Sequence, residues 1–202
     1  HMLHAIGQGA LKVVRRSDVV RKVCRAIQGR PGRPSFYWNV RHFDRQGQLL
    51  FRDAGPNMMH DEGEEYMVKT AFTEELTVPT SFYIGLDDRD GDAHSAPAEA
   101  DTLADLAGEP SGDGYARQGV ASDGTDWTSQ QDGTSGDWEA LSKEVTFQAS
   151  GGDWPVVSTL FLATSSDGTG RLLVTKALSS DRTILDGESL KCTLTVRIGE
   201  AA

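Results

Sequence analysis

Short apolar stretches separated by glycine-rich and aspartate-rich turns run through most of this chain. In the clearest of them, near the end, apolar residues alternate strictly with polar ones: Leu190, Cys192, Leu194, Val196 and Ile198. Alternation with a period of two is typical of a strand that has one face buried and the other exposed. About eight strands at this spacing, separated by turns, predict a β-sandwich or jelly-roll.

The predicted strands are β-prone in composition and are bounded by turns such as Ser122–Thr125 and Leu185–Glu188. They are Phe36–Phe43, Gln48–Arg52, Ser81–Leu86, Gly114–Ala121, Lys143–Ala149, Pro155–Ala163, Arg171–Ala177 and Leu190–Ile198. We expect the first two to form a hairpin about the turn Asp44–Gly47. A long loop is expected over residues 87–112, with a helical turn at Ala100–Leu106.

Two short helices are predicted in the first half of the chain. The first covers residues 18–28, between a Ser17-Asp18 N-cap and Gly29, and its apolar residues recur at helical spacing: Val19, Val20, Val23, Cys24 and Ile27. Because so short a helix is marginal alone, we expect it to order on a partner or on the rest of the chain. The second covers about residues 61–74 and has acids in its first turn, where the helix dipole favours them. The predicted fold is therefore mainly β: a jelly-roll-like antiparallel β-sandwich with two short helices and a basic N-terminal arm.

Charge divides the chain in two. Residues 1–35 carry eight Lys or Arg against one acid, a net charge of +7, whereas residues 36–202 carry 12 against 29, a net charge of −17. We therefore distinguish a basic N-terminal arm, residues 1–35, which holds the first helix and a Gly/Pro-rich linker, from a β-sandwich body, residues 36–202. A basic arm on an acidic body is typical of an arm that binds a negatively charged partner. The predicted partner-binding residues are Lys12, Arg15, Arg16, Arg21, Lys22 and Arg25.

Composition and charge exclude several classes of protein. The sequence has no run of 18 apolar residues, so we expect no membrane-spanning segment. The acidic body repels nucleic acid, and the arm lacks a helix-turn-helix, so we expect no sequence-specific nucleic-acid binding. The arm could contact phosphate, but an acidic protein surface is an equally good target. Cys24 and Cys192 lie far apart without zinc-ligand spacing, which predicts two free thiols in a protein made in a reducing cytoplasm.

One acidic stretch has the spacing of the oxygen ligands in a calcium loop. Counting from Asp88, acids stand at positions one, three, five and twelve: Asp88, Asp90, Asp92 and Glu99. The sharp turn at position six needs glycine, however, and Ala93 stands there. We therefore favour a solvated acidic loop over a calcium site, and we predict no metal and no cofactor.

Three tryptophans lie in or beside polar, glycine-rich loops. Two of them, Trp127 and Trp138, could stack on sugars if exposed, which makes them candidate glycan-binding residues. The other interpretation is that such residues close the ends of a β-sandwich, and we favour it because Trp154 abuts Pro155 and a core strand. The sequence contains no nucleophile elbow or phosphate-binding loop, and no carboxylate pair stands out, so we expect no enzymatic activity.

Several short motifs follow one another through the acidic body. In chain order they are Asn57-x-x-x-Asp-Glu-Gly63, Ser-Phe-Tyr-Ile-Gly-Leu86, Ala100-Asp-Thr-Leu-Ala104, Glu109-x-x-Gly-x-Gly-Tyr-Ala-Arg-Gln118, Trp127-Thr128, Val145-Thr-Phe147, Leu162-Ala-Thr-Ser-Ser166, Gly170-Arg-Leu-Leu173 and Gly187-Glu-Ser-Leu-x-x-x-Leu-x-Val-x-Ile198. In this order, over roughly residues 36–199, the chain resembles virion structural proteins of tailed bacteriophages. Gly114–Gln118 is the most characteristic piece. The basic arm departs from the pattern, which usually begins near the predicted hairpin.

The resemblance implies a β-rich component of the phage particle, made in the host cytoplasm, located in the virion and without catalytic activity. We expect a capsid decoration (cement) protein that associates as a trimer and binds the major capsid protein or another virion protein through its arm. Many copies, each making modest contacts, would stabilise the head lattice by avidity. The alternative is a tail-associated adhesin or carbohydrate-binding module.

Overall fold

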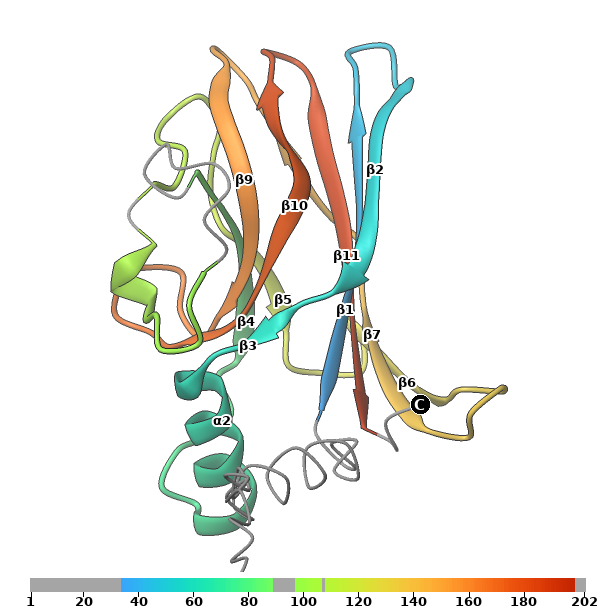
Figure 1. Ribbon diagram of the computed structural model, residues 1–202, viewed down its shortest axis with the longest axis vertical. Helices are drawn as coiled ribbons and strands as arrows, with labels where there is room; N and C mark the ends of the chain where they lie inside the picture. The colour runs from blue at the N-terminus through green and yellow to red at the C-terminus, as the bar shows by residue number, and fades with distance from the viewer. Residues whose placement is uncertain (1–33, 89–96, 107, 199–202) are drawn as a thin grey trace, which may run out of the picture. The chain divides into compact units, whose positions relative to one another are not determined.

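Two antiparallel sheets form the computed structural model of this chain, which describes residues 34–88, 97–106 and 108–198 (Figure 1). The first sheet contains β1 (Ser35–Phe43), β2 (Leu49–Pro56), β6 (Trp127–Gln131), β7 (Trp138–Ser142), β8 (Val145–Gln148) and β11 (Ser189–Ile198). The second contains β3 (Met58–Met59), β4 (Ser81–Asp87), β5 (Gln118–Ala121), β9 (Trp154–Ala163) and β10 (Leu172–Ile184). The spatial orders are β2-β1-β11-β7-β6, with β8 also paired to β11, and β3-β10-β9-β4-β5. The predicted mainly β, antiparallel sandwich is confirmed.

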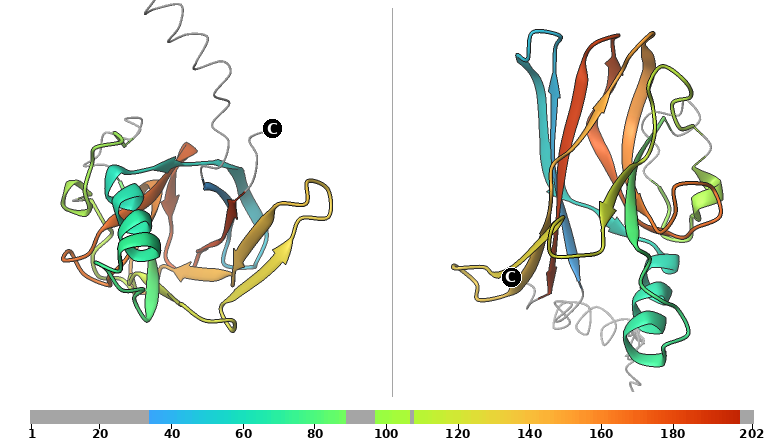
Figure 2. Two further views of the ribbon diagram at one scale, coloured as in Figure 1. Left: turned by 90° about the horizontal axis from the view of Figure 1, so that it is seen from below. Right: turned by 180° about the vertical axis from the view of Figure 1, so that it is seen from behind.

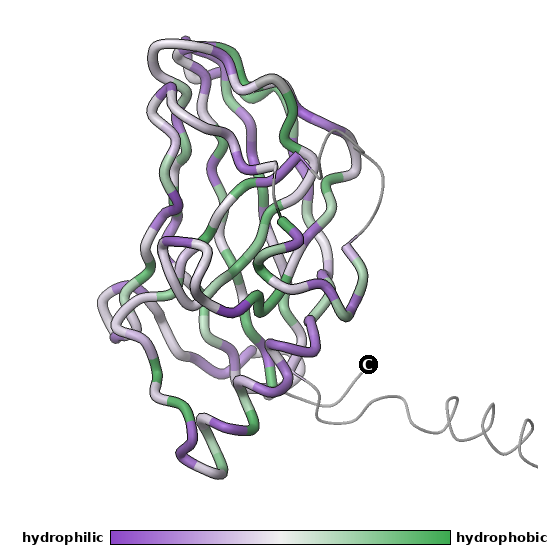
Figure 3. The backbone as a smooth tube through the Cα atoms, turned by 90° about the vertical axis from the view of Figure 1, so that its left-hand side faces the viewer, coloured by the Kyte–Doolittle hydropathy of each residue, from purple (hydrophilic) through white to green (hydrophobic). Residues whose placement is uncertain are grey.

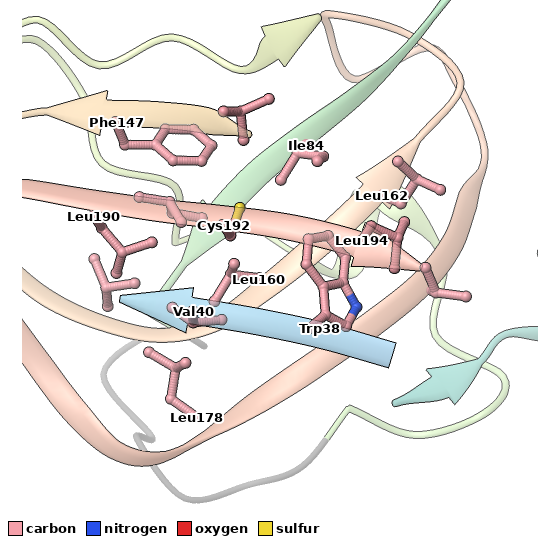
Figure 4. Packing of buried hydrophobic residues seen from close by; sticks show 14 of the residues in the cluster. Trp38, Val40, Ile84, Phe147, Leu160, Leu162, Leu178, Leu190, Cys192 and Leu194 are labelled. Carbon is pink, nitrogen blue, oxygen red and sulfur yellow. The ribbon is translucent and has the colours of Figure 1, made fainter. Parts of the chain in front are cut away.

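Alternate side chains of the two sheets meet in a shared core (Figure 4). Strand β1 pairs along its whole length with β11, which places Trp38 opposite Leu194 and Val40 opposite Cys192. These residues are buried against the second sheet, from which Leu160 contributes. Buried and more exposed residues alternate along β11 up to Leu194, as a one-sided strand requires, whereas β10 begins with five consecutive buried residues; Figure 3 shows hydrophilic and hydrophobic stretches interspersed along the backbone. Each fully buried side chain of this kind contributes about 1.5–3 kcal/mol of transfer free energy.

The two sheets close against each other along both sides. On one side β2 contacts β10, and on the other the short strands β5 and β8 are in contact. Strand β6 takes part in neither closure. It pairs only with β7 among the described strands, and the β6–β7 hairpin projects from the sandwich (Figure 2).

Helix α2 (Asp61–Val68) packs against β10 and continues into a π-helical turn, η1 (Lys69–Thr73). Its first turn is acidic, as the sequence predicts, and the helix expected over residues 61–74 is confirmed. A short 3-10 turn, η2 (Leu103–Asp105), falls inside the predicted turn Ala100–Leu106. Thr102 and Asp105 cap it reciprocally.

Two features of the sheets differ from the sequence prediction. The β6–β7 hairpin lies outside the predicted strands, because both faces of β6 are largely exposed and its sequence Trp-Thr-Ser-Gln-Gln has no apolar alternation. Strand β10 runs past the predicted end at Ala177 as far as Ile184, through a stretch where its register with β9 shifts. The predicted helix over residues 18–28 lies outside the described residues.

Candidate interaction surface and its supporting network

The Gly114–Gln118 motif fastens loops to the sandwich. Its tyrosine, Tyr115, accepts a 2.9 Å hydrogen bond from the backbone N–H of Leu86 and donates a 2.7 Å hydrogen bond to Glu109. The Tyr115 ring packs edge-on against Trp154, with 5.6 Å between centroids. Burial, together with the Glu109 carboxylate, raises the pKa of Tyr115 far above its usual range. The hydroxyl therefore stays protonated and serves as a structural donor.

Arg117 ties three parts of the chain together. Its side chain is only 7% exposed and forms an ion pair with Glu109, whose carboxylate oxygens lie 3.0 and 3.1 Å from Nε. The guanidinium also donates to the backbone carbonyls of Ser165 and Asp167, and it lies 5.0 Å above the centroid of the Phe161 ring. The motif that is most characteristic in the sequence thus serves architecture, because its polar groups are occupied by neighbouring loops.

The motif that opens at Asn57 has the same kind of role. The Asn57 amide, oriented by its partners, donates to the backbone carbonyl of Phe36 and accepts from the indole N–H of Trp38, both at 2.9 Å. Five residues on, the Glu62 carboxylate accepts a 2.7 Å hydrogen bond from the backbone N–H of Leu172. These contacts join helix α2 and its lead-in to strands of both sheets.

Buried polar side chains form hydrogen bonds and an ion pair that connect β1 and β2 to β10. His42 Nε2 donates to Glu188 over 2.9 Å, while its Nδ1 lies 3.3 Å from Arg182 Nε, which donates to it. Asp53 lies 3.3 Å from Lys176 Nζ in a second buried pair. A neutral His42 ring fits this arrangement, because Nδ1 needs a free lone pair to accept from Arg182. Burial lowers the pKa of His42, with Glu188 opposing the shift.

A second buried histidine behaves in the same way. His60 precedes helix α2, is fully buried, and shares a 2.9 Å hydrogen bond with the Thr175 hydroxyl. Its Nδ1 has no hydrogen-bond partner within the described part of the chain. Burial lowers the pKa of His60 below the value of about 6.5 that is typical of an exposed histidine. Protonation of either ring is therefore easier in the unfolded chain than in the folded one.

Mild acid is expected to destabilise the protein through these two histidines. Because the unfolded chain binds a proton at about pH 6.5 and the folded state binds it only at a lower pH, the free energy of unfolding falls as pH drops through that interval. Urea unfolding at pH 7.5, 6.5 and 5.5 measures the slope. A His42→Gln/His60→Gln double variant is expected to be less stable at pH 7.5 but to lose less stability between pH 7.5 and 5.5. An equal loss in both proteins would contradict this account.

The predicted site residues differ in how the structure places them. The six arm cations lie outside the described residues: Lys12, Arg15, Arg16, Arg21, Lys22 and Arg25. Of the possible calcium ligands, Asp88 and Glu99 are described, whereas Asp90 and Asp92 are not. Over residues 34–88, 97–106 and 108–198, no group of three or more His, Cys, Asp or Glu is placed to hold a metal ion. The binding role of the arm and the preference for a solvated acidic loop over a calcium site both stay predictions.

The tryptophans separate into core and surface. Trp154 is buried, as expected for a residue that abuts a core strand. Trp127 is half-buried and packs edge-on against Phe82, whereas Trp138 is 60% exposed. The two candidate glycan-binding residues share one face of the β6–β7 hairpin, but they lie at opposite ends of it. Four residues along the ladder separate them by about 13 Å. Within one chain, therefore, they do not form a single stacking platform.

Two places expose apolar residues that the sequence did not mark as site residues. One is the π-helical turn η1, where Phe72 is 81% exposed. The other is the end of the first sheet, where exposed Ile198 pairs directly with Trp138. Ile198 belongs to the alternating pattern of β11, so the sequence predicts that it points to the core side. What the pattern does not reveal is that the opposite sheet leaves this end uncovered.

The free cysteine in the described part of the chain is Cys192, which is buried, and burial raises the pKa of its thiol. None of the described helices is both long and apolar enough to cross a membrane.

Comparison with protein families matches residues 59–196, more than half of the chain, to the family described as Gp80, podophage GP4 fiber I protein gp80. No curated protein and no solved structure gives a significant match.

Proposed function

Since the chain belongs to the podophage GP4 fiber I gp80 family, and is thus a tailed-phage virion structural protein located in the virion, we propose that it is a non-enzymatic module whose basic arm attaches it to another virion protein. The observation that carries this proposal is the separation of charge between residues 1–35 (+7) and residues 36–202 (−17). An acidic body repels other acidic molecules and so resists non-specific association, while a basic segment is attracted to an acidic surface.

The polar side chains of the sequence motifs are occupied by hydrogen bonds and ion pairs within the body, and this supports a structural role. Glu109 binds both Tyr115 and Arg117, Arg117 also binds the loop at Ser165 and Asp167, and Glu62 accepts from the backbone at the start of β10. Side chains with such occupied polar groups rigidify a scaffold. A rigid body suits a component that has to survive assembly and exposure on a particle.

On the particle, our first candidate role is that of a capsid decoration protein bound to the major capsid protein. Arginine suits this attachment because its planar guanidinium makes bidentate contacts with carboxylates. Copies at the local symmetry axes of a shell would associate as trimers, and each bound copy would stabilise the assembled lattice by mass action.

A second candidate role is that of a tail-associated adhesin or carbohydrate-binding module. Two observations favour it: the word "fiber" in the description of the matching family, and the exposure of Trp138 on a projecting hairpin. An exposed indole offers an apolar face on which a sugar ring can stack. Binding on a glycan array that is lost in Trp138→Ala would favour this role, and an array without hits would count against it.

Deleting residues 1–33 is expected to leave the body folded and to abolish its binding to emptied phage heads. The physical reason is that the deletion removes all eight Lys and Arg of the arm and leaves an acidic body. Cosedimentation with emptied heads at low and moderate salt measures the binding, and circular dichroism checks the fold. Binding by the intact chain should weaken as salt rises, because screening acts on exposed charges.

The matched control replaces charge without shortening the chain. Converting Lys12, Arg15, Arg16, Arg21, Lys22 and Arg25 to Gln should reproduce the deletion, whereas Arg52→Gln on the exposed surface of the body should not. If the deleted chain still cosediments at moderate salt, the arm is not the anchor. If the intact chain binds isolated tails and not heads, the second role is favoured.

A further inference from the structure

Strand β6 is an unprotected edge of the first sheet. It pairs with β7 on one side, and no described strand pairs with the other side. Residues 128–131 are exposed, and the hairpin projects away from the sandwich in both views of Figure 2. The Trp127 N–H donates to the Asp123 carbonyl, but apart from it a free strand edge presents backbone N–H and C=O groups that another strand can satisfy.

The other edges of the sandwich carry the usual protection. Strand β2 contains Arg52, Asp53 and a terminal Pro56, and its register with β1 is shifted by an irregularity. Strand β3 has two residues, and β5 and β8, with four residues each, contact one another. Strand β6 has five residues and contains no charge, no proline and no register shift. Natural sheets rarely leave an edge of this kind open unless it is used.

Exposed apolar surface lies beside the same edge. In the register of the first sheet, Gln131 stands opposite Trp138, and Trp138 stands opposite Ile198. Cross-strand partners share a face, so the three side chains form one row. Trp138 is 60% and Ile198 56% exposed. A contiguous apolar pair next to an open edge is suited to burial by a partner that extends the sheet.

We propose that β6 pairs in antiparallel register with β6 of a second copy of this chain, about a two-fold axis at Ser129. This register places Thr128 opposite Gln130 of the second copy and Trp127 opposite its Gln131. Every facing side chain is uncharged, so two bodies of net charge −17 can approach here without like charges in direct opposition. A strand that is complementary to itself meets the requirement of a two-fold interface.

The residues that flank β6 support the same register. Antiparallel pairing brings Asp126 of one copy toward Asp132 of the other, which would repel if both were bare. Each acid already has a cation: Lys143 lies 2.7 Å from Asp126, and Arg197 lies 3.5 Å from Asp132. Arg197 is shared with Glu139, from which it lies 2.9 Å, so each end of the ladder would carry three acids and two cations, and the two cations offset most of the repulsion between Asp126 and Asp132.

The pairing also joins the two tryptophans that the hairpin keeps apart. Gln131 would lie between Trp138 of its own chain and Trp127 of the second copy, in one row on one face. The inference does not depend on which virion protein the arm binds. It predicts that the soluble chain doubles whatever assembly its other contacts produce, a monomer to a dimer or a trimer to a hexamer.

Charge complementation at Ser129 tests the proposal on the full chain. The two-fold axis places Ser129 opposite itself, so Ser129→Lys alone and Ser129→Glu alone each set like charges in contact. Light scattering over a concentration series should show that each variant has half the mass of the unmodified protein, or a dissociation constant raised at least about tenfold. An equimolar mixture of the two variants should recover the full mass, because Lys then faces Glu.

The controls separate this result from misfolding and from other contacts. Gln148→Lys and Gln148→Glu place the same charges at an exposed strand position on β8 and should leave the mass unchanged. Circular dichroism should show all four variants folded. An unmodified chain that is monomeric throughout the series, single variants with unaltered mass, or a mixture that fails to recover would each overturn the pairing. Cosedimentation with heads reports on the arm separately, so either proposal can fail alone.

Discussion

Replacing Gly63 with alanine is expected to lower the free energy of unfolding by about 3 kcal/mol or more, through a clash that the backbone cannot relieve. Gly63 lies in the first turn of α2, where the helix packs against β10. A Cβ placed there would press on the carbonyl oxygen of Leu173, and would lie 3.0 Å from its Cα. These are main-chain atoms in a paired strand, so they cannot move aside as the end of a flexible side chain would.

The clash should loosen the structure around helix α2 more than the rest of the sandwich. The Leu173 carbonyl accepts the backbone N–H of His60, and the neighbouring Leu172 N–H donates to Glu62. Pushing α2 away breaks both bonds and opens the buried His60 to water. Urea unfolding gives the total loss, and hydrogen exchange should show faster exchange in residues 58–68 than elsewhere.

Gly133→Ala is the matched control for this substitution. Gly133 lies in the loop between β6 and β7, and a Cβ there meets nothing within 4 Å. Its backbone does not have positive φ, so alanine should change stability by no more than about 1 kcal/mol, in the stabilising direction if at all. Equal losses for Gly63→Ala and Gly133→Ala would show that conformational entropy, and not the close approach to β10, governs both.

The sequence predicts the strands that bury apolar residues and fails for the strand that is exposed on both faces. Leu190, Cys192 and Leu194 alternate because β11 lies in the middle of its sheet with one face on the core. Strand β6 has no such face, so its backbone pairing leaves no trace in side-chain polarity. The same reason hides the edge that we propose as an interface. A surface that is used only in an assembly need not differ from a solvated loop in one sequence.

The charge partition and the Gly114–Gln118 motif predict different things about the protein. The +7 and −17 partition is a property of the sequence and needs no fold, so the attachment hypothesis comes from it directly. The Gly114–Gln118 motif stands out in the sequence, but its role depends on Glu109, Ser165 and Asp167, which are separated from it along the chain. Nothing in a single sequence indicates that these residues meet. The motif therefore predicts the family of the protein, whereas only the contacts reveal that Arg117 holds neighbouring loops together.

Replacing Arg117 with alanine is expected to cost about 3–5 kcal/mol, which is the range for breaking a buried ion pair by removing one partner. The substitution leaves the Glu109 carboxylate without its cation, frees the carbonyls of Ser165 and Asp167, and uncovers the Phe161 ring. Urea unfolding measures the loss. Hydrogen exchange should increase in residues 108–112 and 165–170, which this side chain holds together.

Two comparisons decide whether the buried charge is the cause. Arg197→Ala also breaks ion pairs, with Glu139 and Asp132, but the Arg197 side chain is 41% exposed, so its removal should cost only about 0–1 kcal/mol. In the core of the network, an Arg117→Met/Glu109→Gln double variant should be more stable than Arg117→Ala, because it no longer buries an unpaired carboxylate. If Arg117→Ala and Arg197→Ala cost the same, Arg117 is an ordinary surface pair and the motif does not fasten the loops. If the double variant is the weaker of the two, lost packing against Phe161, and not the stranded charge of Glu109, dominates the cost.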